Sequence, residues 1–167
     1  MSTDADLRII AEQEKELVFE SFDEATAFEL GALIRSRGID EKLPIIIDIQ
    51  LWDRPLFYAA LPGSTVNNAD WARRKRNVVR VFHRSTYGLA LEKATPDGLF
   101  PARYGLDPAD YVLAGGGFPI REKGAGVIGA VCVSGLPQRD DHALVVAALC
   151  EKLGKDLGSL ALPQAAS

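Results

Sequence analysis

The residues of this chain best suited to chemistry form one compact motif, Asn68-Ala69-Asp70-Trp71-Ala72-Arg73-Arg74-Lys75. Positions three, four and seven apart share one face of a helix, so Asn68, Trp71 and Lys75 are predicted to lie in a single stripe. An amide, an indole and an ammonium group side by side suit the binding of an anionic or planar ligand. A structural alternative stays open, in which Asn68 caps the helix, Trp71 belongs to the core and Lys75 faces solvent.

A second unusual segment is Gly115-Gly116-Gly117-Phe118-Pro119-Ile120. Consecutive glycines allow a ligand or a neighbouring strand to approach the backbone closely. The segment lacks the Gly-x-Gly-x-x-Gly fingerprint of dinucleotide-binding folds and leads into a strand, so no helix N-terminus is available to hold a phosphate. We interpret it as a tight bend between antiparallel strands. At this bend, Gly116 and the later Gly129 are predicted to leave space beside a pocket, and Phe118 to form an aromatic wall.

The chain has two histidines, His83 and His142, and neither has a second metal ligand near it in the sequence, so no zinc site is predicted. His83 ends the helix of Trp71 and, if haem is bound, is the candidate axial ligand. His142 follows Asp140-Asp141 at the start of the last helix, where we expect a surface or capping residue. A hydrolase that uses Ser134 is rejected, because no Gly-x-Ser-x-Gly elbow exists and adjacent Asp and His residues on a helix cannot form a triad.

Hydrophobic periodicity, caps and turn residues mark the elements that would position these residues. Helices are predicted from Ser21 or Asp23 to Gly38, from Asn67, Asn68 or Asp70 to Phe82, from Ser85 to Lys93 and from Gln138 to Leu157; strands are predicted at residues 43–51, 56–61, 111–114 and 127–134. This order predicts an α+β sandwich, with an antiparallel sheet of four to five strands flanked by helices. We expect one domain over residues 16–160, between an N-terminal arm (1–15) and a tail (161–167).

Length, composition and charge narrow the class of protein. A chain of 167 residues with 47% hydrophobic and 25% charged residues suits one globular domain. A net charge of −4 and a single basic cluster, residues 73–76, argue against a nucleic-acid surface. Cys132 and Cys150 lie in apolar segments without metal-ligand spacing, which indicates buried thiols in a reducing compartment. With no leader and no apolar run of about 20 residues, we expect a cytoplasmic protein without a membrane span.

Three segments together resemble the haem-degrading-domain family, which includes GlcG-like and HbpS-like proteins. They are Asn68-x-x-Trp71-x-x-x-Lys75, the segment Gly115–Ile120, and Val127-Ile128-Gly129-Ala130 through Val133-Ser134-Gly135-Leu136 with Asp141-His142. The resemblance covers residues 22–157 and points to the cytosolic branch that carries the Asn-x-x-Trp helix. It implies a profilin-like sandwich, often assembled as a ring or higher oligomer, in a family with members that bind or degrade haem.

These observations support three functional hypotheses. In the leading one, the chain is a homo-oligomeric protein that binds a small molecule, which is haem, another tetrapyrrole or a small acid. In the second, it is an enzyme that acts on such a ligand, with Lys75 as electrostatic anchor. In the third, it is an oligomeric scaffold without a ligand. The predicted ligand-binding residues are Asn68, Trp71, Lys75, Gly116, Phe118 and Gly129.

Overall fold

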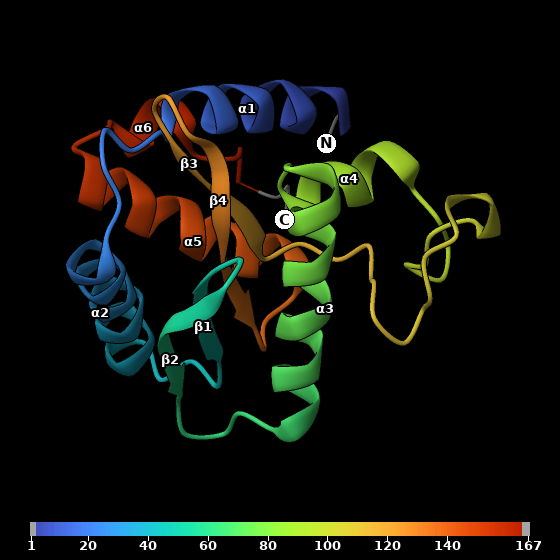
Figure 1. Cartoon of the computed structure of the whole chain (residues 1–167), viewed down its shortest axis with the longest axis horizontal. Helices are drawn as coiled ribbons and strands as arrows, with labels where there is room; N and C mark the ends of the chain where they lie inside the picture. The colour runs from blue at the N-terminus through green and yellow to red at the C-terminus, as the bar shows by residue number, and fades with distance from the viewer. Residues whose placement is uncertain (1–2, 165–167) are drawn as a thin grey trace.

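The computed structural model describes residues 3–164 and has a four-stranded antiparallel sheet at its centre (Figure 1). The strands are β1 (Ile46–Leu51), β2 (Arg54–Ala60), β3 (Gly117–Glu122) and β4 (Gly126–Ser134), in the order β2-β1-β4-β3 across the sheet. Two hairpins, β1–β2 and β3–β4, meet where β1 pairs with β4. The predicted α+β fold class and its antiparallel sheet are confirmed.

Helices cover both faces of this sheet (Figure 1). Their bounds are α1 (Thr3–Glu16), α2 (Glu24–Asp40), α3 (Val66–Phe82), α4 (Thr86–Lys93), α5 (Gln138–Leu153) and α6 (Leu157–Leu160), with a 3-10 turn η1 (Ala102–Tyr104). α3 packs on one face, against β1, β3 and β4, whereas α2 and α5 pack on the other. α1 lies against α4 and α6.

Alternation along the strands gives the two faces of the sheet different side chains. On the face of α2 and α5, large apolar residues such as Ile47 and Val131 form the main core. On the face of α3, β1 and β4 carry smaller or polar residues, including Asp48, Ala130 and Cys132. The polar residues buried in the sheet therefore lie beneath α3.

The caps of α2 and α3 define where these helices begin. The N-cap of α3 is Thr65, and Asn68 is the third helical residue, whose Oδ1 accepts a hydrogen bond from the Thr65 backbone N–H (2.9 Å) in a capping box. The predicted N-cap role of Asn68 is therefore wrong by three positions. Asp23 caps α2 as predicted, but the helix continues past Gly38 to Asp40. Gly38 does not end the helix; the side chain of Leu61 packs where a side chain at this position would lie.

The glycine segment does not form the predicted bend between two antiparallel strands, and residues 111–114 do not form a strand. β3 begins at Gly117, and one residue earlier the carbonyl of Gly116 already accepts a hydrogen bond from the backbone N–H of Val133 (3.0 Å). The turn of this hairpin lies at residues 123–125. The prediction of a bend was wrong because pairing with β4 starts at the glycines themselves.

The residues predicted as an N-terminal arm form a docked helix. α1 buries Ile10 and Gln13, and Nε2 of Gln13 donates a hydrogen bond to the carbonyl of Leu160 in α6 (2.7 Å). Residues 1–2 of the predicted arm and residues 165–167 of the predicted tail lie outside the described residues.

Both cysteines are buried and free of disulfide bonds, as predicted. Burial in the α3 layer raises the pKa of the Cys132 thiol to about 12, so this thiol is not a nucleophile near neutral pH. Among residues 3–164, none of the helices combines the length and the apolar character that crossing a membrane requires.

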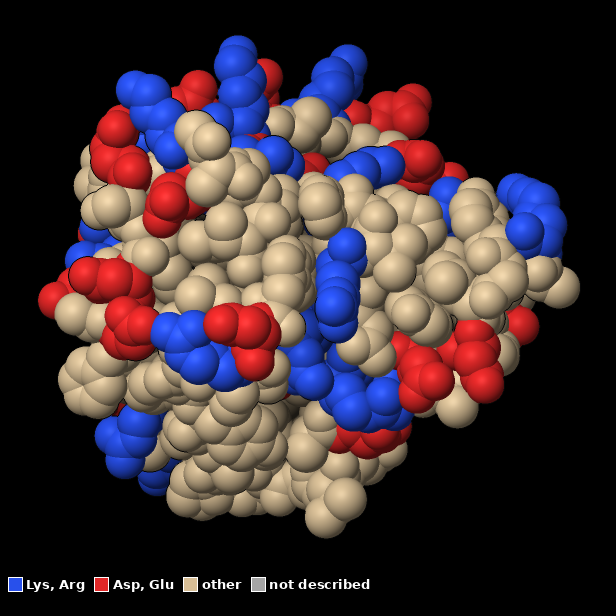
Figure 2. Space-filling model, viewed as in Figure 1, with Lys and Arg blue, Asp and Glu red and all other residues tan. Residues whose placement is uncertain are grey.

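The basic cluster of residues 73–76 is largely neutralised by its neighbours. Arg73 forms ion pairs with Asp70 and Asp110, and Arg76 forms one with Asp48. In Figure 2, basic and acidic side chains lie side by side along the upper rim and at several places across the middle of the visible face.

Candidate functional site

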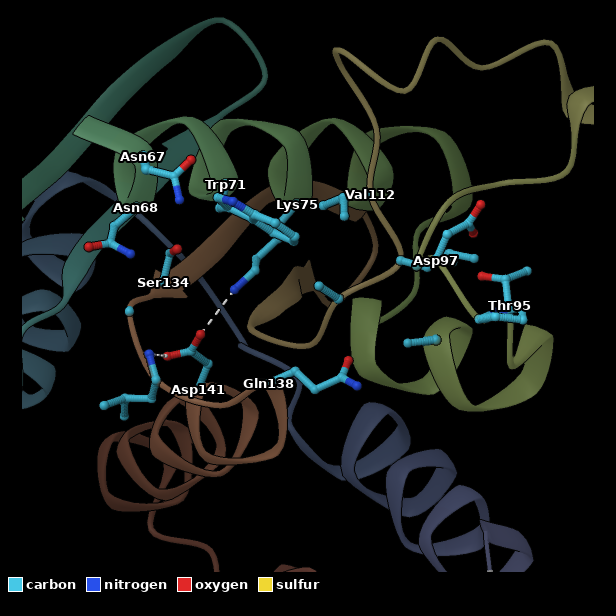
Figure 3. Close-up of a pocket in the computed structure, with 17 residues that line it drawn as sticks. Asn67, Asn68, Trp71, Lys75, Thr95, Asp97, Val112, Ser134, Gln138 and Asp141 are labelled. Atoms are coloured by element: carbon cyan, nitrogen blue, oxygen red, sulfur yellow. Dashed lines mark hydrogen bonds and ion pairs between the residues drawn. The ribbon is translucent and has the colours of Figure 1, made fainter. Parts of the chain in front are cut away.

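A pocket of about 590 Å³ opens between α3 and the first turn of α5 (Figure 3). Its volume falls within the range of roughly 300–1,000 Å³ that is typical of small-molecule sites. The loop after α4 (94–98), the segment before β3 (112–114) and the end of β4 complete its wall. The polar residues that line it include Asn67, Asn68, Lys75, Ser134, Gln138 and Asp141.

A buried ion pair forms the floor of this pocket. Nζ of Lys75 lies 3.0 Å from Oδ2 of Asp141 and also donates a hydrogen bond to the carbonyl of Val133 (3.0 Å). The side chains of Lys75 and Asp141 are only 3% and 1% exposed. The other carboxylate oxygen, Oδ1, accepts a hydrogen bond from the backbone N–H of Leu136 (3.0 Å). Because an unpaired charge is costly at this depth, each group depends on the other.

The glycine segment lies behind this ion pair and makes room for it. A side chain at Gly116 would come within 2.8 Å of Nζ of Lys75 and would overlap the carbonyl oxygen of Val133. Gly116 also has a φ of +128°, which favours glycine. Gly115 fits against Gln138 and donates a hydrogen bond from its N–H to Oε1 of that residue (3.0 Å). The glycines are thus needed for close packing at the site, and they do not line the pocket.

Asp141 is set to change its charge in mildly acidic solution. Burial raises the pKa of this carboxyl to about 6, against the opposing attraction of the Lys75 ammonium group. Above this pH the two charges cancel, and below it Lys75 increasingly lacks a counterion. The net charge of the pocket floor therefore depends on pH.

The upper wall of the pocket carries the stripe that helical spacing predicts. Asn68, Trp71 and Lys75 all face the pocket from α3 (Figure 3). Because Oδ1 of Asn68 is bonded to Thr65, the NH₂ group is the part of this amide left for a ligand. The guanidinium of Arg74 lies 5.0 Å from the centre of the Trp71 ring, which is a cation–π contact.

Two of the residues predicted for the pocket lie elsewhere. Phe118 points to the opposite face of the sheet, where it is 1% exposed in the main core. Gly129 lies within β4, where a side chain would come within 2.9 Å of Cα of Leu51 in β1. The expected aromatic wall at Phe118 and the expected free space at Gly129 are therefore absent from this pocket. Strand alternation explains the first difference and close strand pairing the second.

The histidines also differ from their predicted surroundings. His142 is fully buried, and its Nε2 lies 2.7 Å from Oε1 of Gln13 in α1. Burial, with a smaller effect of the Arg139 charge, lowers the pKa of His142 to about 3. The prediction of a surface or capping residue was wrong because α1 covers this side of α5. His83 is exposed at the end of α3, with its ring 6.4 Å from that of Trp52.

The sequence alone missed the residues that meet Lys75 from outside α3. It named Ser134 and Asp141 in a rejected hydrolase and in the family resemblance, and Gln138 as a helix end, but it predicted none of the three as a pocket residue. One signal was available, since a lysine on the same helical face as a core tryptophan needs a buried acid. The acid that fills this role is 66 residues away, so only the tertiary fold reveals the pair.

An antiparallel sheet between two helical layers, with a polar pocket beside one layer, defines an α+β sandwich protein with a ligand-sized site. The chain belongs to the HbpS-like family of haem-degrading proteins, because the family model described as "Haem degrading protein HbpS-like" matches residues 22–150. A UPF0303 protein of Mesorhizobium japonicum is 60% identical over 97% of both chains. A UPF0303 protein of Brucella melitensis is 59% identical over 93% of this chain and 92% of its own. The predicted family resemblance is confirmed.

Solved structures have the same fold. The Ybr137w protein superposes with a TM-score of 0.78 at 27% identity, over 87% of this chain and 86% of its own. HbpS gives a TM-score of 0.62 at 19% identity, over 80% and 90% of the two chains. A complex of PduOC with haem gives a TM-score of 0.65 at 18% identity, over 80% of this chain and 94% of the PduOC chain. At these last two identities the likeness supports the fold alone.

Proposed function

We propose that this protein binds a small organic molecule in the pocket between α3 and α5. The observation that carries the proposal is the buried Lys75–Asp141 pair, which lies at the floor of a pocket of ligand size beneath the indole of Trp71. Proteins rarely bury a charged pair without a structural or functional reason, and polar groups placed to orient a bound molecule are typical of ligand sites. We also propose that the protein works in the cytoplasm as a homo-oligomer.

Haem is the first ligand to consider, because the family is named for haem degradation and the PduOC structure is a haem complex. Haem iron in proteins is usually held by His, Cys, Met or Tyr. None of these residue types lines the pocket as described, and residues 3–164 contain no cluster of three or more His, Cys, Asp or Glu suited to a metal ion. The pocket residues therefore do not fit haem iron. They suit an organic ligand without iron, such as a small acid or a metal-free tetrapyrrole.

Native mass spectrometry of the protein purified from its own host tests the proposal directly. We expect a non-covalent adduct of small-molecule mass that is lost in Trp71→Ala, because this change removes the upper wall of the pocket. The matched control is Arg80→Ala, which alters an exposed residue later on the same helix and should keep the adduct. No adduct in the wild type, or equal adducts in both variants, would contradict binding at this pocket.

Haem binding at His83 is a second candidate, supported by the exposed imidazole of this residue outside the pocket. A haem titration should then give a Soret shift that His83→Ala abolishes. An unchanged shift in that variant, or no shift in the wild type, removes His83 as the axial ligand.

An enzyme remains an alternative, with Lys75 as an electrostatic anchor for a bound acid. It predicts turnover that collapses in Lys75→Ala while the variant stays folded, and undiminished turnover would remove Lys75 from the mechanism. The scaffold alternative predicts an oligomer without any ligand, and a monomer that binds a metabolite would count against it.

A further inference from the structure

Three hydrogen-bond donors at the pocket have no acceptor within residues 3–164. Lys75 uses only two of its three N–H groups, for Asp141 and Val133. The NH₂ group of Asn68 has no partner, and neither does the hydroxyl of Ser134, although Ser134 is only 3% exposed. All three residues line the pocket, so a ligand that bonds to them together must offer several hydrogen-bond acceptors.

A carboxylate meets this requirement because it only accepts hydrogen bonds and carries two oxygens. Its bond to an ammonium group is charge-assisted, and therefore shorter and stronger than a bond between neutral groups. The three donors come from the first turn of α3, the middle of α3 and the end of β4, and all three residues line the pocket (Figure 3). A terminal carboxylate is a compact ligand group with enough acceptor sites to bond to several of them.

The charges around the floor place a condition on such binding. Lys75 is the single cationic residue of the described lining, whereas Asp141 and, across the pocket, Asp97 are acidic. On α5, Asp140 is exposed, and His142 faces α1 instead of the pocket. A bound anion next to an ionised Asp141 would therefore bring two carboxylates onto one ammonium group. The repulsion is removed if Asp141 is neutral, and burial already raises the pKa of this group to about 6.

We propose that the pocket floor is a carboxylate-binding subsite in which Lys75, Ser134 and Asn68 donate hydrogen bonds to the ligand, while Asp141 takes up one proton from solvent as the carboxylate binds. The proton leaves Lys75 with the ligand as its charged partner and turns Asp141 into a neutral neighbour. This inference rests on the proposed function, which it deepens by naming the class of ligand and the ionic state in which it binds.

Isothermal titration calorimetry with benzoate tests the proposal, with benzamide as the neutral molecule of the same shape. Benzoate should bind at least about tenfold more tightly at pH 5.5 than at pH 8.0, because binding is linked to proton uptake. Benzamide should change by less than about twofold over the same range. Titrations in two buffers of different ionisation enthalpy should show uptake of up to about one proton per benzoate at pH 8.0. Equal benzoate affinity at both pH values, or no proton uptake, overturns the proposal.

Two conservative variants identify the groups involved. Asp141→Asn keeps the shape of the side chain without the titration, so its benzoate affinity should vary by less than about twofold between the two pH values. Ser134→Ala should weaken benzoate about fivefold or more and leave benzamide nearly unchanged. A full pH dependence in Asp141→Asn, or unaltered benzoate binding in Ser134→Ala, contradicts the assigned roles. Lys75→Met should abolish benzoate binding; if it does not fold, the other two variants still decide.

The outcomes separate this inference from the proposed function. A co-purified ligand that lacks a carboxylate, together with benzoate binding that ignores pH, overturns the inference and leaves the pocket as a ligand site. If no co-purified molecule, benzoate or benzamide occupies the pocket, both fail.

Discussion

Lys75 occupies a position that most proteins would give to an apolar residue, since lysine is rarely buried unless it is paired. Three separate parts of the chain compensate for its charge and volume. Asp141 neutralises it, the carbonyl of Val133 accepts one of its protons, and Gly116 leaves space for its ammonium group. The middle glycine of the triple-glycine segment is therefore explained in part by a side chain some 40 positions earlier in the sequence. Sequence pattern alone does not reveal a relation over such a separation.

Replacing Gly116 by alanine should be costly for this reason. The new Cβ would overlap the carbonyl of Val133 and crowd Nζ of Lys75, at a φ that disfavours any side chain. We expect the free energy of unfolding in urea to fall by about 3 kcal/mol or more.

The matched control is Gly124→Ala in the β3–β4 turn. Gly124 also has a positive φ, +83°, but no atom lies within 4 Å of the position of its Cβ. The free energy of unfolding of Gly124→Ala should fall by only about 1–2 kcal/mol, because only the backbone conformation is strained. Equal losses in both variants would show that Gly116 is needed for its backbone conformation and not for the site.

α5 carries two adjacent titratable residues that face different neighbouring helices. Asp141 faces α3, and its pKa is raised from 3.8 to about 6; His142 faces α1, and its pKa is lowered from 6.5 to about 3. The contribution of Asp141 to the free energy of unfolding is fully present below its unfolded-state pKa of 3.8 and is lost as the pH rises through 6. The contribution of His142 to the free energy of unfolding is fully present above its unfolded-state pKa of 6.5 and is lost as the pH falls towards 3. The two contributions oppose each other between pH 4 and 6.

Replacing Asp141 by asparagine should remove its contribution and leave the pH dependence that comes from His142. Between pH 6 and pH 4, the free energy of unfolding of Asp141→Asn should fall more steeply than that of the wild type. The difference in slope should reach up to about 1.4 kcal/mol per pH unit, as measured by urea denaturation.

Asp140→Asn serves as the control for this experiment, because Asp140 is the exposed neighbour on the same helix. Its pH profile should follow that of the wild type. Parallel profiles for Asp141→Asn and the wild type would mean that Asp141 titrates normally in the folded protein.

The sequence predicts most of the helices and strands well, because local signals determine them. Ser85 begins α4 and Asp23 begins α2, each through a side-chain cap that is visible in the sequence. The segment 111–114 was predicted as a strand from its apolar residues, yet its Val112 and Leu113 are buried without sheet pairing. Local pattern predicts burial there, and only the tertiary partner decides between a strand and a packed loop.

The same limit applies to the site. Helical spacing alone was enough to predict that Asn68, Trp71 and Lys75 share a face. The opposite wall comes from α5 and the end of β4, whose approach to α3 depends on the order of strands in the sheet. Phe118 was placed in the pocket because the register of β3 was unknown, and a shift of one residue exchanges the two faces of a strand.

At the scale of the whole molecule, one apolar area is left exposed on α2 and β2. Phe28, Ile39 and Tyr58 are 64%, 42% and 53% exposed, and they border a shallow hollow of about 510 Å³. β2 is also an edge strand of the sheet. Exposed apolar groups beside an unpaired strand edge are typical of surfaces that associate.

We therefore expect Tyr58→Lys to shift the protein to a smaller assembly, because it places a charge within this area. Light scattering coupled to size-exclusion chromatography measures the change in mass. Val66→Lys is the control, since Val66 is 88% exposed at the start of α3, outside the area defined above. A wild-type monomer would refute the expected homo-oligomer, and an unchanged mass in Tyr58→Lys would move the contact elsewhere.

The position of Trp71 has an optical consequence. The chain contains two tryptophans, and the other, Trp52, donates its indole N–H to the carbonyl of Val127 and does not line the pocket. Trp52→Phe would leave a single indole, in the wall of the pocket. The emission of that one fluorophore would then report, without any added label, on the polarity of the pocket and on whatever enters it.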